Sequence, residues 1–124
     1  MRLPFEGHYR TTDGYEAHKK RGSKAPGVDY ALPLKTPVCA ARDGKIIRVE
    51  WGKDGGRFII IQHKESMITL YSHLELVARV VGEWVKEGDV IAYSGATGNA
   101  TGPCLHFGVC QNGVWSDPLK YISL

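Results

Sequence analysis

Length, composition and charge exclude several classes of protein before any motif is considered. The chain has 124 residues, enough for one domain to bury a core without disulfides, and its 15 glycines predict many turns between short elements. The net charge of +3 is mild, and the sequence holds no basic run or basic-aromatic ladder, so we expect no nucleic-acid partner.

Neither a secretory signal nor a membrane span is evident. Polar residues follow Met1–Arg10 where a signal peptide would have an apolar core, and no stretch approaches 18 apolar residues. We therefore expect no membrane partner, and a protein that is cytoplasmic or associated with a phage particle, acting at the cell wall if delivered there.

In chain order, residues 1–26 are predicted to form a polar, irregular lead-in, and residues 27–124 a single domain. Side chains alternate between faces along a strand, so Val28, Tyr30 and Leu32 are predicted to point inward and Asp29 outward. Short β-prone runs separated by Asp-Gly, Gly-Gly and Asn-Gly turns follow, with a short helix or extended connector at residues 74–81. This pattern predicts an all-β fold of antiparallel sheets, sandwich-like and with little helix.

The stretch Ser94–Phe107 contains a glycine-rich loop and, after it, two side chains suited to metal binding or catalysis. Its three glycines and one proline predict a tight, shaped loop, and a strand follows it. On that strand Cys104 and His106 share one face, which suits metal or acid-base chemistry. Cys104 and Cys110 would lie about 20 Å apart on one strand, too far for a disulfide, and whether Cys39 forms one stays open.

The other histidines are weaker candidates. His73 stands at a strand end, where a half-buried imidazole is common, and His63 ends an apolar run and is expected to be structural. His8 and His18 fall in the lead-in and are expected to be solvated.

The order of these residues resembles the M23 family of zinc endopeptidases, also called the lysostaphin or LytM type. That family combines a His-x-Gly-x-Asp segment, a Tyr-x-His-Leu segment, a Ser-Gly-x-Thr-Gly-x-x-Thr-Gly-Pro loop and a closing His-x-His followed by Phe. The corresponding segments here are Gly27–Asp29, Tyr71–Leu74, Ser94–Pro103 and Leu105–Phe107. The resemblance covers about residues 27–122.

The resemblance implies antiparallel sheets that line a groove, and cleavage of short peptide bridges in bacterial peptidoglycan. It places Asp29 and His106 on two zinc-ligand positions and His73 on the position of a histidine that assists acid-base chemistry. The family's first zinc ligand falls on Ala25, and its second assisting histidine falls on Cys104. A lost ligand removes on the order of 3 kcal/mol, or about two decades of zinc affinity.

Two replacements for the missing ligand can be considered from the sequence. Cys104 could join Asp29 and His106, although side chains at i and i+2 of one strand project in parallel about 6.6 Å apart. His18 could fold back over Ala25, but its eleven-residue separation from Asp29 gives no geometric reason to expect this.

The favoured interpretation is a degenerate, non-catalytic domain that binds peptidoglycan peptide or a protein partner, with Tyr30, Tyr71 and Asn99 lining a slot for an extended peptide. The first alternative is an active zinc endopeptidase with an altered site. The second is thiol chemistry at Cys104 with His73 as base.

Overall fold

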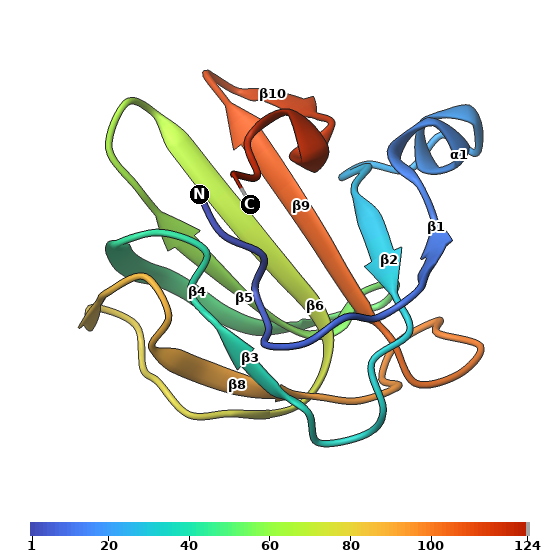
Figure 1. Cartoon of the computed structure of the whole chain (residues 1–124), viewed down its shortest axis with the longest axis horizontal. Coiled ribbons are helices and arrows are strands. Elements are labelled where there is room, and N and C mark those ends of the chain that lie inside the picture. The colour runs from blue at the N-terminus through green and yellow to red at the C-terminus, as the bar shows by residue number, and fades with distance from the viewer. Residues whose placement is uncertain (124) are drawn as a thin grey trace.

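The structure, a computed structural model, describes residues 1–123 and is built almost entirely from antiparallel strands (Figure 1). This confirms the predicted all-β class. The elements in chain order are β1 (Thr11–Asp13), α1 (Tyr15–Lys20), β2 (Val28–Tyr30), β3 (Pro37–Cys39), β4 (Gly44–Gly52), β5 (Gly56–Gln62), β6 (Met67–Val77), β7 (Trp84–Val85), β8 (Val90–Ser94), β9 (Leu105–Gln111), β10 (Val114–Ser116) and the 3₁₀ helix η1 (Pro118–Lys120). Over residues 1–123 no helix has the length and apolar character needed to cross a membrane.

Strand β6 is the centre of the sheet. Its first half, Met67–Ser72, pairs with β9 on one side, and β5 pairs along its other side. Its last residues, Leu74–Val77, pair with β8, which in turn pairs with β3, so the sheet branches where β6 leaves β9. The main path of the sheet runs β1-β2-β9-β6-β5-β4-β7. This order brings the N-terminal strands beside β9, although about 75 residues separate them in sequence.

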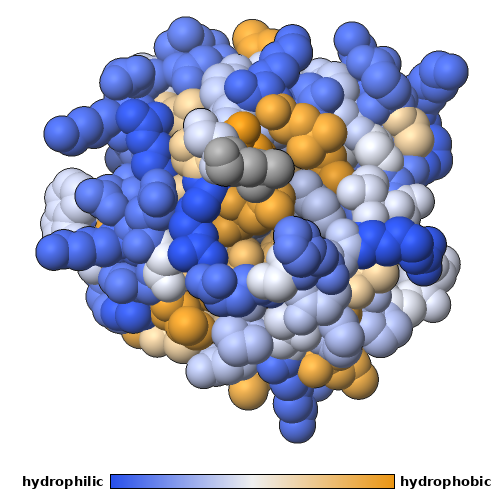
Figure 2. Space-filling model, in the orientation of Figure 1, coloured by the Kyte–Doolittle hydropathy of each residue, from blue (hydrophilic) through white to orange (hydrophobic). Residues whose placement is uncertain are grey.

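Alternation along the strands builds the core. Apolar side chains of β2, β4, β5, β6 and β9 meet on one side of the sheet, where the N-terminal residues Met1–Phe5 also pack (Figure 1). The largest fully buried side chains are Tyr71, Phe107, Leu32, Ile46, Ile59, Ile61, Leu74, Ile91 and Leu105. Hydrophilic side chains cover most of the face seen in Figure 2, around a smaller apolar area near its centre.

The structure differs from the sequence-based expectation in the lead-in, which is ordered. β1 pairs with β2, α1 follows it, and Phe5 is buried against the Tyr30 ring, with their centroids 4.9 Å apart. Of the two alternatives for residues 74–81, residues 74–77 follow the extended one and continue β6, because their backbone pairs with β8. In the lead-in, pairing with a distant strand outweighs a weak local pattern.

A buried polar chain crosses the core beside β6. His63 Nδ1 donates to the Asp43 carbonyl at 2.8 Å, and its Nε2 accepts from the Thr69 hydroxyl at 2.7 Å. Thr69 Oγ1 in turn accepts from the Tyr71 hydroxyl at 2.7 Å, and the Ala41 amide donates to the Tyr71 oxygen at 3.1 Å. Each donor faces an acceptor only if His63 is neutral with its proton on Nδ1. The structure agrees with the expected structural place of His63.

Thr69→Val should therefore lower the free energy of unfolding by about 1 to 3 kcal/mol, because it leaves His63 Nε2 and the Tyr71 hydroxyl buried without their shared partner. Chemical denaturation measures this, and Thr11→Val on the exposed strand β1 is the matched control. If the two substitutions lowered the free energy of unfolding equally, the hydrogen-bond chain through Thr69 would not be stabilising as proposed.

Stability should also depend on the ionisation of His63. Burial lowers the pKa of His63 below its ordinary value, so the unfolded chain takes up this proton at higher pH than the folded one. The stabilisation is complete above about pH 6.5 and is lost as the pH falls below that value.

The difference in unfolding free energy between wild type and His63→Asn should accordingly shrink from pH 7.5 to pH 5. Wild type and His8→Asn, which changes an exposed histidine, should keep a constant difference over the same range. A wild-type advantage over His63→Asn that grows on acidification would show that the sign is wrong.

Candidate active site

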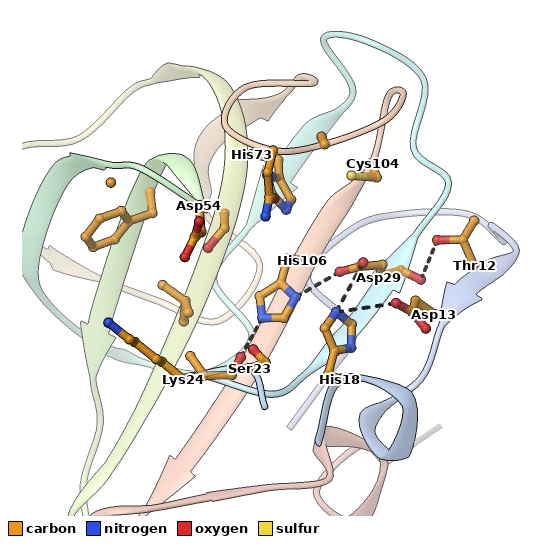
Figure 3. Close-up of a pocket in the computed structure, with 18 of the residues that line it drawn as sticks. Thr12, Asp13, His18, Ser23, Lys24, Asp29, Asp54, His73, Cys104 and His106 are labelled. Carbon is orange, nitrogen blue, oxygen red and sulfur yellow. Dashed lines mark hydrogen bonds and ion pairs between the residues drawn. The ribbon is translucent and has the colours of Figure 1, made fainter. Parts of the chain in front are cut away.

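Three neighbouring strands place acidic and imidazole side chains in a row. Asp29 of β2 lies opposite His106 of β9, and Asp13 of β1 lies opposite Asp29 from the other side. His106 is also paired with Ser72 of β6. The sheet order thus brings residues 13, 29 and 106 together at the floor of one cleft (Figure 3).

Asp29 and His106 are in direct contact. His106 Nδ1 lies 2.8 Å from Asp29 Oδ1, and His106 Nε2 lies 2.9 Å from the carbonyl oxygen of Ala25. Gly27 allows this approach, because a Cβ there would overlap the Phe107 carbonyl and lie 3.0 Å from His106 Nε2. Ala25 therefore takes part in the site through its backbone, although its side chain offers no donor atom.

His18 corrects the expectation of a solvated side chain. It is only 5% exposed, and its Nε2 lies 3.2 Å from Asp29 Oδ2 and 3.9 Å from Asp13 Oδ2. Its Nδ1 is 2.8 Å from the carbonyl oxygen of Gly14. The fold of α1 onto the edge of the sheet brings His18 to Asp29, a tertiary contact that no sequence spacing signals.

The three side chains form a compact donor set. Within residues 1–123, the group of potential metal ligands that the structure assembles is His18, Asp29 and His106, with one donor atom of each inside 4.8 Å of the others. The rings of His18 and His106 meet edge to face at a centroid distance of 4.8 Å.

The electrostatics keep Asp29 ionised. Burial alone would raise the pKa of the Asp29 carboxyl, but hydrogen bonds from His106 and His18 hold it well below its ordinary value. The hydrogen bond with Asp29 raises the pKa of His18, against the effect of burial. The carboxylate is thus available as a ligand at neutral pH.

His73 lies at the cleft with a fixed orientation. Its backbone has a φ of +66°, its amide donates to the Gly55 carbonyl at 2.7 Å, and its Nδ1 lies 2.7 Å from the Thr97 carbonyl. A carbonyl only accepts, so Nδ1 carries the proton and Nε2 keeps the lone pair. Burial lowers the pKa of His73, which favours this neutral form.

Cys104 lines the same cleft but stands apart from the donor set (Figure 3). Burial, with a smaller contribution from the Asp29 charge, raises the pKa of the Cys104 thiol to about 11. At neutral pH the group is therefore a thiol, which is a poor nucleophile.

The cleft has a volume of about 1050 Å³. Asn99 lines it, as do all four residues that the sequence brings to the site: Asp29, His73, Cys104 and His106. The two tyrosines do not fit the expected slot. Tyr30 and Tyr71 are 4% and 0% exposed and belong to the core, because their strands turn these side chains inward, so neither can contact a peptide in the cleft.

Comparison of the sequence with known proteins identifies its relatives. A sequence model of peptidase family M23 matches residues 23–118. The chain is 39% identical to the peptidoglycan DD-endopeptidase ShyB of Vibrio cholerae, with 96% of the chain aligned, and 40% identical to the DD-carboxypeptidase/endopeptidase Mpg of Neisseria meningitidis, with 76% aligned. These relatives are much longer, and the alignments span 29% and 22% of their lengths.

Solved structures share the fold. The catalytic domain of lysostaphin from Staphylococcus simulans superposes with a TM-score of 0.81 at 31% identity, covering 91% of both chains. A zinc-containing peptidase from Vibrio cholerae gives a TM-score of 0.81 at 35% identity, covering 92% of this chain and 37% of its own.

The glycine loop, residues 94–102, is clamped to the turn between β4 and β5, and this contact positions His73. Gly98 has a φ of +77°, and a Cβ on it would overlap the backbone of Gly56. Beside it, the Thr97 hydroxyl donates to the Leu74 carbonyl at 2.9 Å while the Thr97 carbonyl accepts from His73.

Gly98→Ala should therefore cost roughly 2 kcal/mol of folding free energy and loosen the His73 ring. Thermal unfolding and the ¹⁵N shifts of the ring measure the two effects. Gly102→Ala in the same loop is the control, since a Cβ there meets nothing within 4 Å. Unchanged ring shifts in the Gly98 variant would rule out this clamp as the device that orients His73.

Proposed function

Because the chain belongs to peptidase family M23, we propose that it is a metal-dependent endopeptidase domain that cleaves peptide cross-links in bacterial peptidoglycan. The observation that carries this proposal is the donor set of His18, Asp29 and His106 at the floor of an open cleft. The names of ShyB and Mpg support peptidoglycan peptides as the substrate class. Since the chain spans under a third of either relative, the activity is proposed for this domain alone.

The donor types suit a zinc ion. Ligand atoms about 2.0 to 2.1 Å from one tetrahedral zinc lie roughly 3.3 Å apart. His106 Nδ1 lies 2.8 Å from Asp29 Oδ1, His18 Nε2 lies 3.2 Å from Asp29 Oδ2, and one donor atom of each residue lies within 4.8 Å of the others, so a bound zinc would draw the three groups closer together. Each imidazole also holds a backbone carbonyl with its other nitrogen, the usual arrangement around a metal-bound histidine. Zinc, when bound, lowers the pKa of a water and polarises the carbonyl of the scissile bond.

The chain itself supplies a proton acceptor and a surface for the peptide. His73 holds its Nε2 lone pair beside the donor set, with its ring 6.2 Å from that of His106, and is placed to accept a proton from an attacking water. The glycine loop from Ser94 to Gly102 forms one wall, where Asn99 and exposed backbone groups can align an extended peptide.

Two other functions would give different results in the experiment described below. Peptide binding without cleavage is favoured by Cys104, which stands where the family has a second assisting histidine, and by the loss of a donor at Ala25. Thiol catalysis at Cys104 is disfavoured, since the raised pKa of the thiol leaves little thiolate at neutral pH.

Digestion of purified peptidoglycan is the direct test. The zinc-loaded protein should convert cross-linked muropeptide dimers to monomers, as resolved by chromatography and mass spectrometry. Chelation should stop the reaction and added zinc restore it, and His106→Ala or His73→Ala should abolish it while His8→Ala leaves it intact. Retention on peptidoglycan with no cleavage by zinc-saturated protein would contradict the proposal and favour the binding function.

Cys104→His should raise the cleavage rate. A second imidazole in the cleft can transfer protons near neutral pH where a thiol with a pKa of about 11 cannot, an effect of about 10² or more in favourable cases. Cys104→Ser is the matched control and should not accelerate the reaction. If His and Ser variants have equal rates, proton transfer at this position does not limit the enzyme.

A further inference from the structure

The missing ligand of this site has a substitute in a different part of the chain. We propose that His18 is the third metal ligand, carried on α1, and that the ion fastens α1 to the edge of the sheet. This inference rests on the proposed function only for the identity of the metal.

The geometry singles out His18 among the neighbouring side chains. Its Nε2 faces Asp29 Oδ2 at 3.2 Å while His106 Nδ1 faces the other oxygen of the same carboxylate at 2.8 Å. Cys104 does not belong to this set, and His73 has its Nδ1 engaged with Thr97. Figure 3 shows His18 and His106 both turned toward Asp29 from opposite elements, one from the helix and one from the strand.

The hydrogen bonds of the two imidazoles leave one nitrogen of each for a cation. His18 Nδ1 faces the Gly14 carbonyl and His106 Nε2 faces the Ala25 carbonyl, so both of these nitrogens donate. The other nitrogen of each ring faces one oxygen of the Asp29 carboxylate, and a cation bound there would be shared by the two imidazoles and the carboxylate.

With His18 in place of a ligand at position 25, the third ligand comes from a different element, but the metal position beside Asp29 and His106 stays the same. Ala25 keeps its carbonyl on His106 Nε2, so the chain still orients the ligand from β9 at the point where the family's histidine would stand. Asp13 Oδ2 lies 3.9 Å from His18 Nε2, the nitrogen that would bind the metal, and is paired with Arg21, so a second carboxylate stands at the edge of the proposed site.

Metal binding should consequently be linked to the docking of α1. Apart from His18, the helix is held by the Tyr15 hydroxyl, which donates to the Trp115 carbonyl at 2.9 Å, and by the pairing of β1 with β2. Because His18 lies on this short helix, it completes the donor set only when α1 is docked against the edge of the sheet.

Zinc affinity, measured by competition with a chromophoric chelator, tests the assignment without any substrate. Wild type should bind one zinc per chain, and His18→Phe, which keeps a ring but no donor, should bind about 100-fold more weakly. His8→Phe, at an exposed histidine, should match wild type. Ala25→His in the His18→Phe background should recover most of the lost affinity, which also shows that the doubly substituted chain is folded.

Hydrogen exchange supplies a second readout. Zinc should slow exchange of the α1 amides in wild type but not in His18→Phe. The assignment is overturned if His18→Phe binds zinc as tightly as wild type, or if wild type binds no zinc. Zinc binding that depends on His18, without any cleavage of peptidoglycan, would support His18 as a metal ligand and refute the endopeptidase function. Cleavage that survives His18→Phe would support the endopeptidase function and refute His18 as a required ligand.

Discussion

One half-buried carboxylate organises the functional end of this molecule. Asp29 stands between two imidazoles, and without them its partial burial would favour the uncharged form. Each contact comes from a different element: His106 from β9 and His18 from α1. The order β1-β2-β9 at the edge of the sheet is what makes the three meet, so the site is a consequence of strand pairing.

The rest of the cleft is held by backbone contacts that leave side chains free. The Ala25 carbonyl fixes His106, and the Thr97 carbonyl fixes His73. Glycines at 27 and 98 permit these close approaches, since any side chain would collide with neighbouring backbone. A groove built this way offers rigid imidazoles and open space, which suits chemistry on an extended peptide.

Much of the fold and part of the site could be predicted from the sequence. Alternating runs and Gly-rich turns are local signals, and they predicted the strands; the motif order led to Asp29, His73, Cys104 and His106, which all line one cleft. Their chemical roles stay predictions. The two tyrosines do not line the slot. Alternation along β2 already predicted that Tyr30 points inward, as it does, and the motif position of Tyr71 did not tell which face of its strand the side chain occupies; Tyr71 lies wholly inside the core. His18 could not be found, since its contact depends on β1 pairing with β2 and on α1 folding back over the edge.

We propose that this member of family M23 keeps a three-ligand metal centre by taking one ligand from α1. Anomalous diffraction from a zinc-soaked crystal at the zinc absorption edge tests it most directly. The account predicts a single peak bonded at about 2.0 to 2.2 Å to His18 Nε2, an Asp29 oxygen and His106 Nδ1. A peak coordinated by Asp29 and His106 with His18 turned away, or no peak at this site, would contradict it.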